Sequence, residues 1–254
     1  MSHDRLTKQK IRHDPIREFL NMSYTAIEEH VEDYWRAYLL MVIAILAVIV
    51  GGIFLWNHIQ EKRAHASLLL SQAMDAYNAP VLPENTKLRQ QLSARGQLYF
   101  TSSKEWAAEV NKRLKAVENA SGSSATENTA RLYLALTQAR TGKLDEALKT
   151  SAPLINDDTF KPLALMLQGR IYESKGDLKK AEKSWSDLAK IHTDNFPQGQ
   201  GLAFLAEFYT RTHQTAKAQK TYKELQSELT GKVDPKDPLL TRAKDQLKQL
   251  QGSA

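Results

Sequence analysis

Residues 169–185 read GRIYESKGDLKKAEKSW, and the architecture expected for the rest of the chain follows from them. The phrase GDLKKA at 176–181 has a counterpart thirty-four residues earlier, GKLDEA at 142–147. Self-similarity at a fixed period of this length is typical of proteins built from repeated helical pairs. The two phrases therefore predict an all-α solenoid in this half of the chain.

A period of thirty-four residues is that of the tetratricopeptide repeat, a helix-turn-helix unit. In the best copy, Gly169 and Ala181 are small where the two helices of the unit press together, while Tyr172 and Trp185 fill the space between them. Gly176 falls in the turn, where a residue without a side chain adopts strained backbone angles most easily. The sequence thus explains each position of the repeat in physical terms.

Two looser copies flank this one. The later copy lies three residues late, after an insertion near 195–197, and has His213 where the turn glycine would be. Its matching positions are Leu202, Leu205, Ala206, Tyr209, Ala218 and Tyr222. The earlier copy keeps Leu134, Ala135 and Ala147 but places Gln138 and Ser151 at positions that are usually aromatic. We expect tetratricopeptide-like repeats over 126–230.

Helices are expected on both sides of the repeats. Residues 231–254 contain a loop and then a stripe of Leu239, Leu240, Ala243, Leu247 and Leu250, which suits a capping helix over the last repeat. Residues 57–125 should hold a helical stem and the first helix pairs. There we expect a helix to about 79, a second over 86–100, and a third starting at Ser102 with Glu105 as its capping box.

Residues 37–56, AYLLMVIAILAVIVGGIFLW, contain no charged or amide side chain. Twenty helical residues span the roughly 30 Å hydrocarbon core of a bilayer, and aromatic residues at both ends suit the headgroup zones. A buried core helix and a cleaved signal peptide are the alternatives. The length of the run and the 36 residues before it favour an uncleaved transmembrane helix.

Residues 1–36 are interpreted as a cytoplasmic tail with an amphipathic stem. The stem is read either as an interfacial or partner-binding helix or as a solvated one. Charges close to the span are balanced, but the short tail as a whole carries six Lys and Arg. We therefore expect the amino terminus in the cytoplasm and the repeat domain outside, since large domains cross largely regardless of charge.

Composition narrows the chemistry. The 254 residues include no cysteine, which excludes disulfides, thiol catalysis and thiolate metal sites. The net charge of +6 is spread over a helical domain and predicts solubility rather than nucleic-acid binding. No pair of histidines at the helical i, i+4 spacing, no phosphate loop and no nucleophile elbow is present in the sequence. We expect no enzyme, no metal and no cofactor.

A short tail, one anchor and an outward repeat domain together resemble the YfgM family of bacterial inner-membrane proteins. The likeness is carried by the span with Trp56 at its edge, by Ala66-Ser67-Leu68 after it, and above all by residues 169–185. The resemblance implies a periplasmic solenoid ancillary to the Sec translocon. It also implies protein partners such as translocon subunits, a periplasmic chaperone or nascent chains.

Two classes of function are compatible with the sequence: a membrane-tethered module that holds polypeptides near the translocon, and a scaffold of another envelope assembly.

The expected binding surface is the concave face built by the first helices of the repeats. Its predicted positions are Leu132, Leu136, Met166, Arg170, Glu207 and Arg211; burial of the three apolar ones under the preceding helices over 86–120 is the competing interpretation. Ala47 and Gly51 are spaced to let another membrane helix approach closely.

Overall fold

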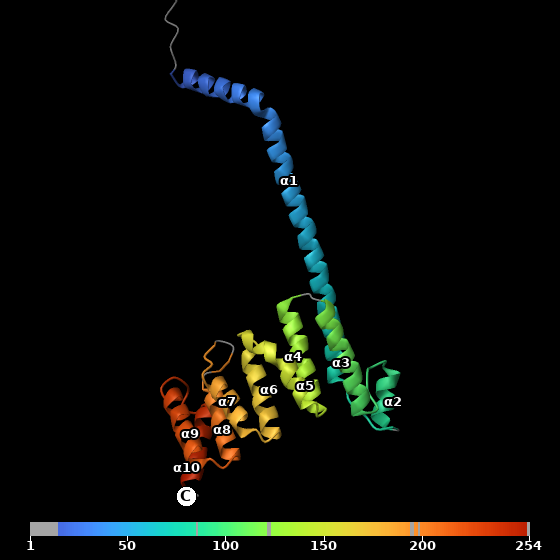
Figure 1. Ribbon diagram of the computed structural model, residues 1–254, viewed down its shortest axis with the longest axis vertical. Coiled ribbons are helices and arrows are strands. Elements are labelled where there is room, and N and C mark those ends of the chain that lie inside the picture. The colour runs from blue at the N-terminus through green and yellow to red at the C-terminus, as the bar shows by residue number, and fades with distance from the viewer. Residues whose placement is uncertain (1–14, 85, 121–122, 194–195, 198, 253–254) are drawn as a thin grey trace, which may run out of the picture. The chain divides into compact units, whose positions relative to one another are not determined.

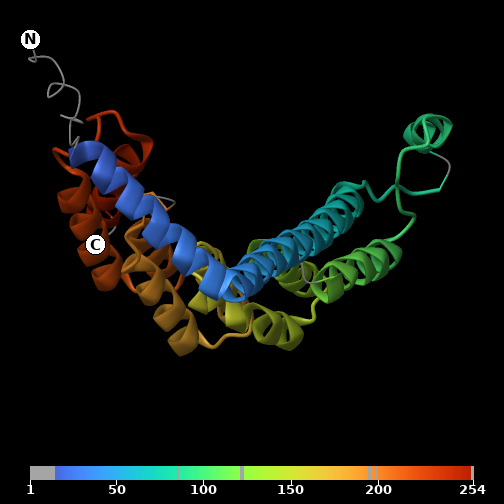
Figure 2. The same cartoon turned by 90° about the horizontal axis from the view of Figure 1, so that it is seen from above.

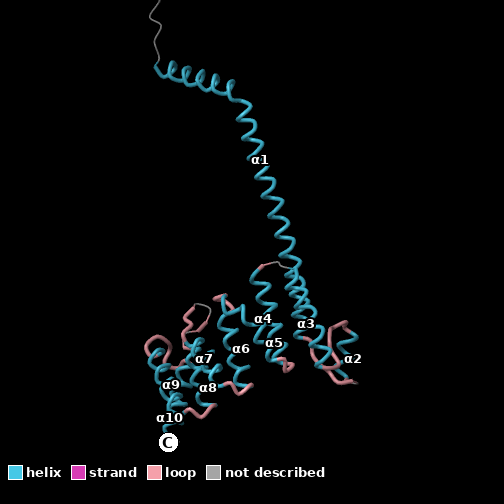
Figure 3. The backbone as a smooth tube through the Cα atoms, in the orientation of Figure 1, coloured by secondary structure: helices cyan, strands magenta, loops and turns pink. Residues whose placement is uncertain are grey.

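A computed structural model describes residues 15–84, 86–120, 123–193, 196–197 and 199–252, with side chains from Tyr34 onward (Figure 1). The described residues are mostly helical, with loops and turns between the helices, as the tube in Figure 3 shows. The elements are α1 (Pro15–Asn78), α2 (Lys87–Ala94), α3 (Ser103–Ala120), α4 (Ser124–Arg140), α5 (Leu144–Ser151), the 3₁₀ helix η1 (Ala152–Asn156), α6 (Lys161–Ser174), α7 (Leu178–Ala189), α8 (Gln200–Arg211), α9 (Thr215–Leu229) and α10 (Pro238–Gly252).

The chain divides into two compact units, 1–60 and 61–254. In the first unit, the side chains of 37–56 are exposed to the surroundings along the whole apolar stretch. One helix of the described chain is long and apolar enough to cross a membrane, and it contains this stretch. Residues 1–14 and the side chains of 15–33 lie outside the described part, and so does the expected amphipathic face of the stem.

In the second unit, the last turns of α1 pack against α3 and α4. The apolar stripe of α3 is buried, with Trp106, Val110 and Leu114 at most 2% exposed. The indole nitrogen of Trp106 donates a hydrogen bond to the Tyr77 carbonyl at 3.1 Å, which ties α3 to the end of α1. The helix expected to run to about residue 79 ends at Asn78 and is the last part of α1, which also contains the apolar stretch.

The start of α3 follows the expected cap with one change. The Ser102 hydroxyl accepts the Glu105 N–H at 3.1 Å, as a capping residue should. The Glu105 carboxylate, however, accepts the N–H of Thr101 at 2.9 Å instead of that of Ser102. The hydrogen bond by which the Glu105 side chain closes the capping box is therefore made one residue earlier than expected, to Thr101.

The predicted helix over 86–100 is wrong in its second half. The helix α2 ends at Ala94, and Gly96 has a φ of 64°. The chain then extends so that Phe100 pairs with Val81 and donates its N–H to the Pro80 carbonyl at 3.0 Å. This path buries Phe100 to 4% exposure in the core beside Trp106, which a continued helix would not allow.

The three predicted helical pairs are α4–α5, α6–α7 and α8–α9, and consecutive helices lie side by side (Figure 2). Their turns are built alike: Gly142 and Gly176 have φ of 80° and 73°, and His213 has 55°. Left-handed backbone is rare for residues other than glycine, so His213 adopts a conformation imposed by the repeat. The predicted cap is confirmed as α10, which buries Leu240, Ala243 and Leu247.

The contact between α6 and α7 depends on Gly169. A Cβ placed there would lie 2.5 Å from Cε2 of Trp185, and the Trp185 side chain is 1% exposed. In the first pair the equivalent residues are Ala135 and Ser151. A smaller residue on the second helix thus accompanies a larger one on the first.

The first pair has a short second helix. The helix α5 has 8 residues, against 12 for α7 and 15 for α9. Pro153 follows two residues after the end of α5, and because proline lacks an N–H it cannot continue the helical ladder. The chain turns instead into η1, and Asp187, thirty-four residues after Pro153, lies inside α7.

Candidate protein-binding surface

The first helices of the second and third pairs, α6 and α8, frame a pocket of about 360 Å³. Three of the predicted groove residues, Arg170, Glu207 and Arg211, line it together. The remaining lining residues are Glu173, Ser174, Trp185 and Phe204. The repeat register therefore brings the polar groove positions to one place, although they lie up to forty-one residues apart in the sequence.

Glu173 is the centre of this pocket. Its carboxylate accepts two close hydrogen bonds from Arg211, at 2.8 and 3.1 Å from Nη2, and a third from Nε at 3.2 Å. The indole nitrogen of Trp185 also donates to it, at 2.7 Å. Planar, two-atom pairing of this kind fixes orientation as well as charge. Arg211 is therefore held by the chain itself, and no local pattern in the sequence points to this pairing across thirty-eight residues.

Glu207 links the same pocket to the capping helix. Its carboxylate lies 3.0 Å from Arg242 on α10 and 3.8 Å from Arg211. Arg170, in contrast, is exposed and forms no ion pair with a described residue. Of the two arginines at the predicted groove positions, only Arg170 is thus available to a ligand without breaking an internal pair.

The apolar positions of the predicted groove are placed differently. Leu132 is 7% exposed and packs with Leu154 and Ala164. Leu136 and Met166 are half-buried beside neighbouring core clusters. The cover comes from the repeats themselves, so these side chains offer less apolar surface than the sequence alone suggested. Whether they take part in binding stays a prediction.

The expected contact face of the membrane helix is accessible. A Cβ placed on Gly51 would meet no other atom within 4 Å, and Ala47 is exposed. A second helix could approach closely there. Contact between helices at this face stays a prediction.

Clusters that could hold a metal ion are absent from the described residues. The α6–α8 pocket contains acids, bases and aromatic rings that are already bonded to one another, and beside them the exposed guanidinium of Arg170. Such an arrangement is suited to recognising a polar group of a partner.

Paired helices with left-handed turns, stacked and capped, define an α-solenoid, a class whose extended surfaces bind other proteins. A family model described as a tetratricopeptide repeat-like domain matches residues 32–195, well over half of the chain. The chain belongs to this family. Its fold is typical of protein-interaction scaffolds without enzymatic activity.

Two solved structures are similar to the chain. Both are of a Podosopora anserina putative kinesin light chain with nearly identical TPR-like repeats, and the second is a variant with one substitution. They share 14% and 15% identity, with TM-scores of 0.45 and 0.48. They cover 66% and 74% of this chain, and 85% and 89% of their own. No curated protein matches the chain.

Proposed function

We propose that this protein is a membrane-tethered protein-binding module that serves in the periplasm as an accessory or chaperone-like factor at the Sec translocon. The family supports a role in protein interaction, and the apolar stretch of α1 supports tethering. The translocon and the periplasm are suggested by the resemblance of 37–56 and 169–185 to YfgM proteins. The observation that carries the binding role is the α6–α8 pocket with its exposed Arg170.

The alternative is a scaffold subunit of another envelope assembly complex. Both functions use the same surface, but they differ in the number of partners. A chaperone-like module should contact many polypeptides, whereas a scaffold should contact one protein in a fixed ratio.

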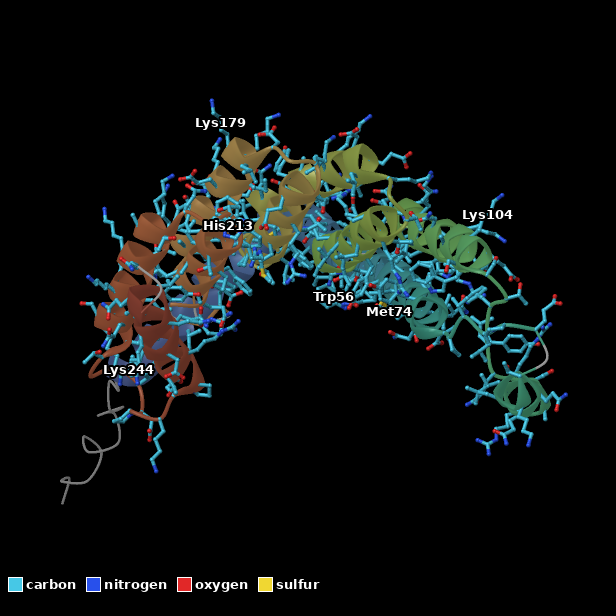
Figure 4. All side chains as sticks on the ribbon, turned by 90° about the horizontal axis from the view of Figure 1, so that it is seen from below. Trp56, Met74, Lys104, Lys179, His213 and Lys244 are labelled. Atoms are coloured by element: carbon cyan, nitrogen blue, oxygen red, sulfur yellow. The ribbon has the colours of Figure 1, made fainter. Side chains whose placement is uncertain are left out.

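A photo-reactive amino acid at position 170 of the full membrane-embedded chain distinguishes these functions. Many different adducts that include nascent chains would support the translocon role, and one dominant adduct would support the scaffold. The same probe at Lys179, whose side chain projects outward from α7, is the matched control (Figure 4). Equal adducts at both positions, or none at either, would contradict a binding role for the pocket.

We further propose that residues 1–36 stay in the cytoplasm and that 37–56 cross the inner membrane. A reporter that is active only in the periplasm, fused after Ala254, should be active. Activity of a reporter that works only in the cytoplasm would reverse the orientation.

A further inference from the structure

A second pocket, of about 730 Å³, lies along the helices α6 and α7. Its apolar lining includes Ile155 of η1, Leu165 and Tyr172 of α6, and Ile191 just after α7. It is separate from the α6–α8 pocket, with which it shares no lining residue. We refer to it as the α6–α7 groove.

The end of α5 explains why this groove is open. In a stacked solenoid, the second helix of one pair packs against the next pair. The helix α5 stops at Ser151, ahead of Pro153, and only Ile155 of η1 reaches the groove. The last turns of a full-length helix are missing from this place.

In the following pair, α8–α9, the corresponding groove is filled by a side chain of the preceding helix. The corresponding residues in α8–α9, thirty-seven positions later, are Tyr209 for Tyr172 and Lys217 for Lys180. There Glu182, from the preceding helix α7, accepts a hydrogen bond from the Tyr209 hydroxyl at 2.8 Å and another from the Lys217 ammonium at 2.8 Å. One carboxylate joins the tyrosine and the lysine of the next pair.

The α6–α7 groove has the tyrosine and the lysine but lacks this carboxylate. Lys180 lies 5.5 Å from the centre of the Tyr172 ring, as Lys217 lies 5.1 Å from that of Tyr209. Thirty-four residues before Glu182, however, stands Leu148. Among the described residues, no hydrogen bond of the Tyr172 hydroxyl to another group is found.

The rim of the groove is basic. It carries Lys161, Lys180, Lys183 and Lys190 against one acid, Asp187. Lys180 and Lys190 are paired with exposed acids one turn away, and such surface pairs are worth at most about 1 kcal/mol. Lys161 and Lys183 form no ion pair with a described residue. An acidic ligand is therefore complementary in charge.

From this comparison we propose that the α6–α7 groove binds an acidic amphipathic helix of a partner protein, which places one carboxylate between Tyr172 and Lys180 as Glu182 does in the next pair. The apolar face of the helix covers Ile155 and Ile191, which are half-buried at the groove, and further acids meet Lys161 and Lys183. Ten residues separate Lys180 from Lys190, so the rim is about 15 Å long and accommodates roughly three helical turns. The proposal deepens the proposed function, because it names the chemistry of one partner segment.

The probe is a fluorescent helical peptide of Leu, Ala and Glu, about four turns long, with the Glu residues flanking a Leu stripe. Its counterpart has Lys in place of every Glu. Binding to the detergent-solubilised full chain is measured by fluorescence anisotropy at low and at physiological salt. We expect the acidic peptide to bind, the basic peptide not to bind, and salt to weaken binding.

Two pairs of charge reversals test the location. Lys161→Glu with Lys183→Glu should weaken binding of the acidic peptide on the order of tenfold, because attraction becomes repulsion at two sites. Lys104→Glu with Lys244→Glu makes the same change of charge on exposed side chains of α3 and α10 (Figure 4) and should leave binding within about twofold. Tyr172→Phe, which removes only the hydroxyl, should weaken binding a few-fold.

Equal effects of the two double variants would overturn the proposal, because binding would then follow net charge. Absence of acidic-peptide binding, or equal binding of the basic peptide, would overturn it too. These outcomes are distinguishable from failure of the proposed function. Adducts at position 170 without peptide binding in the groove would support the protein-binding function and contradict only the proposed α6–α7 groove site.

Discussion

In the third helical pair, α8–α9, the groove is filled by the chain itself. Glu182 of the preceding helix α7 accepts hydrogen bonds from Tyr209 and Lys217. In the second pair, Tyr172 and Lys180 stand in the same relation, but Leu148 of the shortened α5 is the residue that corresponds to the acid in the repeat register. The difference arises from two features of the preceding pair, a proline that ends a helix and a leucine that replaces a glutamate. Repeats with one plan can thus differ in what they leave open to a partner.

Among the variants that test this comparison, Gly169→Ala should reduce the free energy of unfolding most, because the added Cβ would meet the Trp185 ring at 2.5 Å. Overpacking of this kind destabilises by about 1–3 kcal/mol. Urea denaturation of the solubilised chain, followed by tryptophan fluorescence, measures it. The control is Ala206→Gly at the equivalent position of α8, which should cost about 1 kcal/mol. Equal losses would show that Trp185 does not hold α6 against α7.

Tyr209→Phe tests the filled groove and should cost about 1 kcal/mol at neutral pH, since it removes the hydroxyl bonded to Glu182. Tyr172→Phe should leave stability nearly unchanged, because its hydroxyl has no equivalent acceptor among the described residues. The same denaturation measurement compares the two variants. A larger loss for Tyr172→Phe would contradict the assignment of the open and the filled groove.

The filled groove should also depend on pH. Burial, and then the hydrogen bond to Glu182, raise the pKa of Tyr209 from 10.0 to about 12. A raised pKa in the folded chain means that the stabilisation is complete below pH 10 and is lost as the pH rises towards 12. Wild type should therefore lose more stability than Tyr209→Phe over this interval. Parallel profiles for the two proteins would argue against the raised pKa.

At the acid end the carboxylate is the titrating group. The hydrogen bonds from Lys217, and then from Tyr209, lower the pKa of Glu182 below its usual value of 4.5. Its contribution is therefore present above that value and is lost as the pH falls through the lowered pKa. Comparison with Glu182→Gln over the acid range measures this part.

The smallest effects concern the turns. Gly176 and His213 both adopt left-handed backbone, at φ of 73° and 55°. Gly176→Ala should destabilise the chain by about 0.5–1 kcal/mol, because alanine is strained in left-handed backbone. His213→Gly should stabilise it by no more than that amount. It relieves backbone strain, but the greater freedom of glycine in the unfolded chain offsets part of the gain. Melting temperatures of the two variants, shifted in opposite directions, would support a common turn. Shifts in the same direction would not.

Much of the fold could be predicted from the sequence, because repeat period, small residues and turn positions are local signals. Gly169, Gly176 and Ala181 mark the pair α6–α7 directly, and the stripe from Trp106 to Val117 marks α3. The end of α2 could not be read in this way, because burial of Phe100 decides it. The early end of α5 could have been predicted from Pro153, although the repeat period alone does not indicate it.

The candidate site was predictable only in part. The repeat register placed Arg170, Glu207 and Arg211 on one surface, and the structure brings them to one pocket. It could not reveal that Glu173 holds Arg211, since pairing across thirty-eight residues depends on the packing of α6 against α8. Nor could it reveal the role of Glu182, which emerges only when the grooves of successive pairs are compared.

The most direct measurement on the open groove is made with Leu148→Glu, which supplies the second pair with the carboxylate that the third pair already has. We predict that this carboxylate bonds to Tyr172 and Lys180, that its pKa, followed by NMR titration, falls below that of an ordinary glutamate, and that the acidic peptide binds at least about tenfold more weakly. A carboxylate that titrates like an exposed glutamate in a folded chain, with peptide binding unchanged, would contradict the account.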